Sequence, residues 1–196
     1  MFTSAFVNTT LDSAIAVGDK LSLHTAYSTT GANEVTGGSY ARQTGTWNAA
    51  SGRSKALSSA VSFTGLPAAT TVAFVGHWDS AGSVFKGMTA NGGTEFSFQV
   101  DLTNNKILVE GSGFANDDRV VFTGTPPTGL TEGTIYFVVG TTAGDPDTFQ
   151  VATTSGGAAI DITAQASVDC KVSKVILETF TASGGTLNVN TYVTKL

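Results

Sequence analysis

The segment TEFSFQV, residues 94–100, indicates the class of fold, because its apolar and polar residues alternate. Its two phenylalanines and its valine fall on one face of an extended chain, and the polar residues fall on the other face. This period of two is typical of a strand with one buried surface. The same alternation recurs in TVAFVGHW, residues 71–78, and in TLNVNTYVTKL, residues 186–196. The sequence therefore predicts a mainly β protein.

Further strands are expected wherever short apolar runs lie between Gly, Asn, Asp and Pro, the residues that favour turns. These runs are residues 20–26, 55–63, 106–111, 119–124, 134–140, 148–154, 158–163 and 170–177. Helical structure is expected only in TLDSAIAV, residues 10–17, as one or two turns with Asp12 or Ser13 as the N-cap.

The composition restricts the function as well as the fold. Hydrophobic residues make up 41% of the 196 residues and charged residues 13%, so the chain can bury a core and does not have the composition of a disordered protein. The net charge of −5 and the ten scattered basic residues argue against nucleic acid or an anionic membrane as a partner. No apolar run is long enough for a bilayer span and no secretion signal is recognisable, so we expect synthesis in a cytoplasm.

The spacing of the strands predicts two domains. Between residues 101 and 172 the strands are short and evenly spaced, which favours a small β-barrel or β-sandwich. The strand near the C-terminus needs a partner, because a lone strand is unstable in water. We expect it to pair with the N-terminal block, so that residues 1–100 and 173–196 form a β-sandwich or jelly-roll-like domain and residues 101–172 are an insertion in it.

Two parts of the chain resemble proteins of tailed bacteriophages. The run LSLHTAYSTTGANEVTGGSYARQ (residues 21–43), with VSFTGLPAATTVAFVGHWDS (61–80) and GSVFKG (82–87), is similar to a family of phage tail fibre proteins. The segments GSGFANDDRVVFTGTPPTGLTEGTIYFVV (111–139) and DTFQVATTSGGAAIDIT (147–163) resemble a β module of phage fibres and virion surface proteins.

This resemblance implies a non-enzymatic protein exposed on the virion surface, made in the cytoplasm of a bacterial host. Its partners would be other virion proteins, either the major capsid protein or tail proteins, and it would form a homo-oligomer, for which a trimer is the expected form. The chain has no coiled-coil or shaft repeat of the kind that a long fibre needs. A capsid decoration protein is therefore favoured over a tail fibre, although both readings stay open.

Residues 22–43, which belong to the first segment that resembles phage tail fibre proteins, are rich in Thr, Gly, Asn and Ser and contain few side chains that a core could bury. An ordered loop of this length usually has a use, and we expect it to contact a neighbouring subunit. The alternative is a solvated loop with no partner. The residues expected at the interface are Thr29, Thr30, Asn33, Glu34, Tyr40 and Arg42, of which the last two would be its amphipathic anchors.

No pattern predicts catalysis or a cofactor. His24 and His77 lie in expected strands, and the sequence contains no nucleophile elbow, P-loop or zinc-protease motif. Four aspartates in turns carry calcium-type oxygens but lack the spacing of a known loop, so no metal is expected; they are Asp117, Asp118, Asp145 and Asp147. Cys170, the only cysteine, is expected to be a buried free thiol.

Recognition of a host glycan is the rival function, because fibre receptor-binding domains hold sugars on exposed aromatic side chains. The candidates for such a contact are Trp47, Trp78, Tyr136 and Tyr192. Trp78 is in phase with a strand core and Tyr136 lies in an apolar run, so both are expected to be at least half buried. Trp47 has less apolar company and is the one residue proposed for glycan contact.

Overall fold

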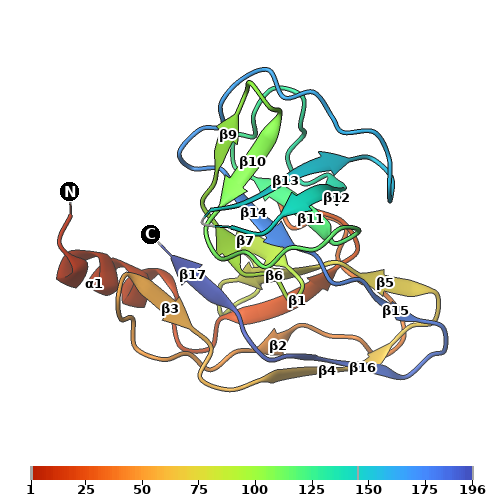
Figure 1. Cartoon of the computed structure of the whole chain (residues 1–196). Helices are drawn as coiled ribbons and strands as arrows, with labels where there is room; N and C mark the ends of the chain where they lie inside the picture. Colours follow the sequence, from red (N-terminus) through yellow and green to blue (C-terminus); the bar gives the residue numbers. More distant parts are fainter. Residues whose placement is uncertain (1, 145, 196) are drawn as a thin grey trace. The chain divides into compact units, whose positions relative to one another are not determined.

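The computed structural model describes residues 2–144 and 146–195, with only the main chain of residue 195. The prediction of a mainly β protein is confirmed: the described residues form a single helix and a series of short strands, all paired antiparallel (Figure 1). The chain divides into two compact units, which we call unit 1 (Met1–Asn91 with Leu177–Leu196) and unit 2 (Gly92–Ile176). No helix in the described part of the chain is long and apolar enough to cross a bilayer.

Unit 1 contains one four-stranded sheet, in the order β2-β1-β6-β7, and three two-stranded pairs, β3-β17, β4-β16 and β5-β15. In Figure 1 the three C-terminal strands run beside β3, β4 and β5. The elements are α1 (Ser4–Ala14), β1 (Lys20–His24), β2 (Gln43–Thr44), β3 (Ser54–Ala56), β4 (Val61–Leu66), β5 (Thr70–Val72), β6 (Phe74–Trp78), β7 (Phe85–Ala90), β15 (Glu178–Phe180), β16 (Gly185–Val189) and β17 (Val193–Lys195).

The core of unit 1 lies between the four-stranded sheet and the strand pairs, in the manner of a β-sandwich. Leu21 and Leu23 of β1 contribute to one side of this core, and Phe63 of β4 and Val189 of β16 contribute to the other. The alternation of β4 is regular, with buried residues separated by exposed ones. The predicted return of the C-terminal strand is also present, because β16 pairs with β4 over Val189 to Gly185 with one irregularity.

The helix differs from the sequence-based expectation. It spans Ser4–Ala14, and its N-cap is Thr3, whose hydroxyl accepts a hydrogen bond from the Phe6 amide at 3.3 Å. Asp12 lies in the last turn, so the expected start at Asp12 or Ser13 was wrong. Val7 and Leu11 are buried together at helical spacing.

Unit 2 is one seven-stranded antiparallel sheet in the order β8-β14-β11-β12-β13-β10-β9. Its two edge strands, β8 (Glu95–Phe96) and β9 (Gln99–Asp101), are separated by two residues, which span roughly 10 Å at most. The two edges must therefore lie close together, and the sheet rolls up like a small barrel around its apolar core. The other strands are β10 (Lys106–Val109), β11 (Arg119–Thr123), β12 (Ile135–Thr142), β13 (Asp147–Ala152) and β14 (Lys171–Lys174).

The strand expected at 158–163 does not form. The side-chain amide of Asn105 takes the place of a neighbouring strand there, donating to the Ile160 carbonyl and accepting from the Ile162 amide, both at 2.7 Å. Gln165 makes the same kind of contact with both main-chain groups of Val100. Side chains thus make the hydrogen bonds to the backbone that a neighbouring strand would have made if residues 158–163 had formed a strand.

The boundaries of the two units differ from those expected. The segment 94–100 was placed in the N-terminal domain, but β8 and β9 pair with β14 and β10 inside unit 2. Residues 173–174 were also placed outside the middle block, and they belong to β14. Whether unit 2 is an insertion that leaves unit 1 able to fold alone stays a prediction.

Candidate functional site

The segment between β1 and β2 forms the most elaborate surface feature of unit 1, and it is fixed by an ion pair. Arg42 donates from Nε and Nη2 to both carboxylate oxygens of Glu34, at 2.7 to 3.0 Å, and from Nη1 to the Gly82 carbonyl at 2.6 Å. Its guanidinium carbon lies 3.4 Å from the centre of the Trp78 ring. The side chains of Arg42 and Glu34 are only 25% and 16% exposed. The nitrogen atoms of the guanidinium are therefore occupied by hydrogen bonds, and one face of the group is covered by the Trp78 ring.

Tyr40 completes this arrangement. Its hydroxyl donates to Glu34 Oε1 at 3.1 Å and accepts from the Leu23 amide at 2.9 Å, and its ring stacks on Phe63 with the centroids 6.1 Å apart. Burial raises the pKa of the phenol well above its ordinary value. Tyr40 and Arg42 were expected to anchor a neighbouring subunit, but in the structure they hold the loop against the core of their own unit.

The tip of the loop carries the exposed interface candidates. Thr29, Thr30 and Asn33 are exposed, whereas Glu34 lies beneath them as the partner of Arg42. The Ser28 hydroxyl accepts hydrogen bonds from the main chain of Thr30 and Ala32, at 3.1 and 2.9 Å. These bonds give the tip a defined shape.

Two residues of the tip have left-handed backbones. Asn33 has φ 61° and its amide donates to the Tyr27 carbonyl at 3.2 Å. Gly31 has φ 81°, and a Cβ atom there would lie 2.5 Å from the Trp78 ring. The tip therefore lies close over the same tryptophan that carries Arg42, and this closeness requires glycine.

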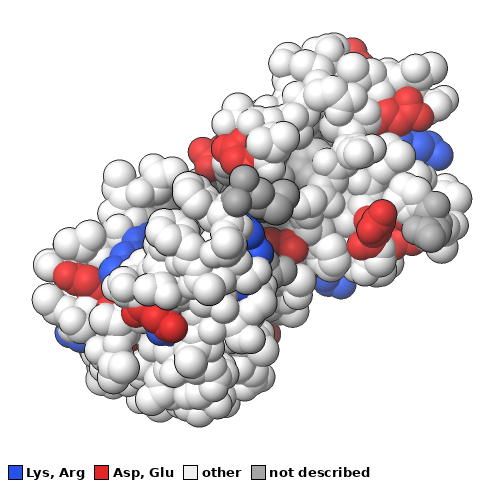
Figure 2. Space-filling view, turned by 90° about the vertical axis from the view of Figure 1, so that its left-hand side faces the viewer, with Lys and Arg blue, Asp and Glu red and all other residues white. Residues whose placement is uncertain are grey.

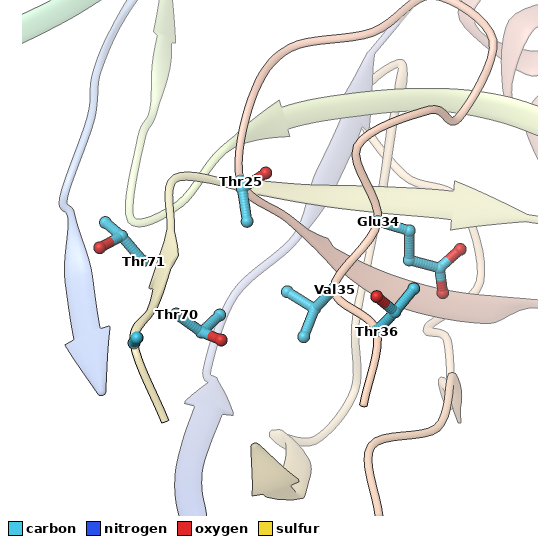
Figure 3. Close-up of a pocket in the computed structure, with 7 residues that line it drawn as sticks. Thr25, Glu34, Val35, Thr36, Thr70 and Thr71 are labelled. Atoms are coloured by element: carbon cyan, nitrogen blue, oxygen red, sulfur yellow. The ribbon is translucent and has the colours of Figure 1, made fainter. Parts of the chain in front are cut away.

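A shallow hollow of about 470 Å³ lies beside this loop. Figure 3 shows its lining, in which Thr70 and Thr71 come from β5 and the carboxylate of Glu34 points away from them. Hydroxyl groups dominate the lining, which consists of Thr25, Glu34, Val35, Thr36, Ala69, Thr70 and Thr71. Such a surface can donate and accept hydrogen bonds but offers neither an aromatic platform nor a free charge.

The threonines of this hollow were not singled out in the sequence. They are distant in the chain and meet because the loop pairs along β1, where the Val35 amide bonds to the Leu23 carbonyl. On the other side the Ala73 amide, just after β5, bonds to the carbonyl of His24. No motif or period relates these segments, so only the topology could have revealed the hollow.

His24 belongs to a buried chain of hydrogen bonds beneath the loop. Its Nδ1 lies 2.8 Å from the Ala32 carbonyl, which must accept, so Nε2 is the acceptor for the Ser22 hydroxyl at 2.7 Å. Ser22 in turn accepts from Trp78 Nε1 at 2.8 Å. Burial lowers the pKa of His24. A serine hydroxyl that donates to an imidazole is the arrangement that activates a serine nucleophile. Here the side chains of Ser22 and His24 are both fully buried, so a substrate cannot reach them.

His77 belongs to a separate buried cluster. Its Nε2 lies 3.0 Å from Asp19 Oδ2, which also accepts from Lys86 Nζ at 2.6 Å. Lys86 donates further to the Ala14 carbonyl at 2.6 Å. Burial lowers the pKa of His77. The hydroxyl and the carboxylate thus contact different histidines, and the described residues assemble no Ser-His-Asp set around either ring.

Three of the four aromatic candidates for sugar contact are buried, and the fourth, Trp47, is half buried. Trp47 is half buried, and its ring centroid lies 5.1 Å from that of His77 and 5.8 Å from that of Tyr192. Trp78 lies under Arg42, and Tyr136 and Tyr192 are buried. Trp47 therefore packs against the core with part of its side chain, and the rest of the side chain stays exposed.

The remaining candidates are bound within their own units. Asp118 pairs with Lys174 at 2.6 Å, and Asp147 accepts from the Gly113 amide. Among residues 2–144 and 146–195, no three His, Cys, Asp or Glu side chains are grouped as metal ligands. Asp145 lies outside the described residues. Cys170 is buried and free, as expected, and burial raises the pKa of its thiol to about 12.

Comparisons with known proteins add no relative: no family model, no curated protein and no solved structure matches this chain.

Proposed function

We propose that this chain is a non-enzymatic structural protein of a tailed-bacteriophage particle, exposed on the particle surface and docked there through unit 1. The observation that carries the proposal is the loop between β1 and β2. Its exposed tip is held by the Arg42–Glu34 pair and by Trp78, so its shape is fixed before any partner arrives. A preordered surface loses little conformational entropy on binding, which suits repeated docking by shape.

The chemistry of the tip fits a protein partner. Thr29, Thr30 and Asn33 present hydroxyl and amide groups without a charge. Figure 2 shows acidic and basic side chains scattered among uncharged atoms on the face in view, with no basic patch of the kind that phosphate binding needs. The proposed partner is a coat or tail protein of the same particle, and a capsid decoration protein and a short fibre are the two forms that this role takes.

Rebinding to particles tests the proposal. Particles of the encoding phage, made without this chain, would be mixed with purified protein and sedimented, and bound copies would be imaged by cryo-electron microscopy. Wild type should occupy regular positions on head or tail. Thr30→Glu should reduce the occupancy at least tenfold, whereas Thr153→Glu, an exposed threonine of unit 2, should leave it unchanged. Absence of wild type from such particles would refute the proposal.

A receptor-binding module that recognises a host glycan is the second candidate, and the threonine-lined hollow is the observation that favours it. Its hydroxyls could pair with sugar hydroxyls, although the structure offers no stacking ring beside them. A glycan array probed with wild type and with Thr70→Val would decide between the two. Specific binding that the substitution abolishes would favour the glycan role, and a blank array at high protein concentration would remove it.

A further inference from the structure

Asp19 and Lys86 meet at one end of the four-stranded sheet of unit 1, and His77 lies between them. Asp19 precedes β1 by one residue, His77 belongs to the neighbouring strand β6, and Lys86 belongs to β7 beyond it. His77 is in register with Leu21 of β1 and with Gly87 of β7. Three adjacent strands thus bring a carboxylate, an imidazole and an amine together.

The two carboxylate oxygens of Asp19 have unequal surroundings. Asp19 is completely buried, and its Oδ2 accepts hydrogen bonds from His77 Nε2 at 3.0 Å, Lys86 Nζ at 2.6 Å and the Ala16 amide at 3.2 Å. Its Oδ1 is buried as well, but has no hydrogen-bond partner among the described residues. A buried carboxylate oxygen without a partner is unfavourable, so the cluster is not explained by an ion pair alone.

The amine of Lys86 is placed to react with this carboxyl group. Its Nζ lies 2.6 Å from Asp19 Oδ2, so the carbon Cγ, one bond further, is at roughly the 3–3.5 Å of a near-attack contact. A second hydrogen bond, from Nζ to the Ala14 carbonyl at 2.6 Å, holds the amine there. Two groups fixed at this separation react far faster than the same groups free in water.

The donors around Oδ2 form an oxyanion hole. Because Oδ2 can only accept, the hydrogen atom of the contact with His77 is on Nε2, and the Ala16 amide is a second fixed donor. These two donors stabilise the negative charge that develops on Oδ2 when a nucleophile adds to Cγ. The Trp47 ring packs on that of His77, with the centroids 5.1 Å apart, and adds to the burial of the cluster. Conversion of the ammonium and the carboxylate into a neutral amide removes two charges from this site.

We propose that Lys86 Nζ and Asp19 Cγ form a covalent amide, an isopeptide cross-link, with release of one water molecule. One Nζ proton passes to Oδ1, which leaves a neutral amine and a carboxylic acid whose carbonyl oxygen is Oδ2. The amine lone pair then forms the Nζ–Cγ bond, and the electron pair of the carbonyl moves to Oδ2. A second Nζ proton passes to Oδ1, the Cγ–Oδ1 bond breaks, and water leaves as Oδ2 becomes a carbonyl oxygen again. The third proton stays on the amide nitrogen.

The product keeps the hydrogen bonds of the cluster. The carbonyl oxygen Oδ2 still accepts from His77 and Ala16, and the amide nitrogen still donates to Ala14. The oxygen that leaves is Oδ1, so no carboxylate oxygen remains buried without a partner. The new bond joins residues 67 positions apart in the chain and ties the edge strand β7 to the start of β1, which restricts the unfolded chain. The inference does not depend on the proposed virion role.

The pair formed by Lys55 and Asp12 provides the comparison within unit 1. Lys55 Nζ lies 2.7 Å from Asp12 Oδ1, almost the same distance as in the pair of Lys86 and Asp19. The side chain of Asp12 is 43% exposed, however, whereas that of Asp19 is 1% exposed. Water solvates the carboxylate of Asp12, so this pair should remain ionic.

Mass spectrometry of the purified full chain, denatured before the measurement, tests the cross-link. Wild type should be lighter than its sequence predicts by one water molecule. A tryptic digest should contain peptide 1–20 joined to peptide 56–106, because trypsin does not cleave after a lysine whose Nζ is acylated. A wild type with the full mass of its sequence, or a digest that releases 56–86 as a free peptide, would overturn the proposal.

Two variants separate the cross-link from another loss of water, such as cyclisation of Asp19 onto its own main chain. Lys86→Arg keeps the positive charge but has no nucleophilic amine, so it should have the full mass. Lys55→Arg is the matched control and should be lighter by one water, like wild type. A Lys86→Arg chain that still lacks one water would assign the loss to another reaction and refute the cross-link. The wild-type digest decides the outcome by itself if Lys86→Arg does not fold.

Discussion

The guanidinium carbon of Arg42 lies over the Trp78 ring, 3.4 Å from its centre, while Nε and Nη2 donate to both carboxylate oxygens of Glu34. Trp78 ends β6 and Arg42 precedes β2, so this contact joins the loop to the sheet that it covers. Only a planar, delocalised cation can make both contacts, because it stacks on an aromatic ring while its N–H groups form two hydrogen bonds to a carboxylate. The contact explains why a loop with so little to bury is ordered.

Replacement of Arg42 by lysine should therefore destabilise unit 1, although the charge is kept. A lysine ammonium cannot stack on Trp78 and form the two-pronged contact with Glu34. We expect a loss of about 1–2 kcal/mol in the free energy of unfolding. Chemical denaturation followed by tryptophan fluorescence measures it, since both tryptophans lie in unit 1. Arg119→Lys in unit 2 is the control and should leave this transition unchanged.

Gly31→Ala should destabilise the loop more than a positive φ alone explains. Gly31 and Gly52 both have left-handed backbones, but an added Cβ meets the Trp78 ring at 2.5 Å at Gly31 and nothing within 4 Å at Gly52. Gly52→Ala should cost about 1 kcal/mol through the backbone, and Gly31→Ala about 2–3 kcal/mol. Denaturation curves of the two variants give the comparison, and equal losses would show that the tip lies away from the ring.

Unit 1 should lose stability as the pH falls below about 6.5, the ordinary pKa of histidine. Burial lowers the pKa values of His24 and His77 in the folded chain, so the unfolded chain binds more protons in this window. Stability therefore rises with pH up to that value and levels off above it. The pKa values of carboxyl groups such as Asp12 and Asp79 are lowered in the folded chain, so the stability that they contribute is lost only when the pH falls below their ordinary pKa of 3.8. Their effect therefore does not overlap with that of the histidines.

Denaturation of unit 1 measured by tryptophan fluorescence from pH 8 to about 5 checks this expectation, and NMR titration of the two imidazoles shows which ring takes up the proton. Unit 2 contains no histidine and provides the internal comparison. A free energy of unfolding that stays constant between pH 7 and 5 would contradict the burial of the two imidazole rings.

The period of two revealed the fold class because it reports burial on one face of a strand, and β6 and β16 overlap the alternating segments 71–78 and 186–196. It failed where side chains replaced strands, as Asn105 does for residues 158–163. The direction of Tyr40 and Arg42 could not be read from the sequence either. An amphipathic side chain can contact a neighbouring subunit or pack against its own core equally well. Only the positions of Trp78 and Glu34 decide between these two possibilities.

The thiol of Cys170 should be unreactive in the folded protein. Burial raises its pKa from an ordinary value of 9.0 to about 12, which lowers the thiolate fraction at pH 8 by roughly a thousandfold. A disulfide reagent at pH 8 should therefore modify the native chain at least a hundredfold more slowly than the chain in denaturant. Rapid reaction without denaturant would show that the core of unit 2 opens readily.

Removal of unit 2 should leave unit 1 folded. The Asn91 amide bonds to the Ala73 carbonyl, and Glu178 pairs with Val72, the residue next to Ala73. The ends of the excised segment thus lie close together, and a short Gly-Ser link can replace residues 92–176 without straining β7 or β15. The shortened chain should melt cooperatively, with tryptophan emission like that of the full chain. Its matched partner is the same deletion with Gly31→Ala, which should melt at a lower temperature by the same mechanism as in the full chain. A shortened chain without a cooperative transition would mean that the sandwich depends on unit 2 for its stability.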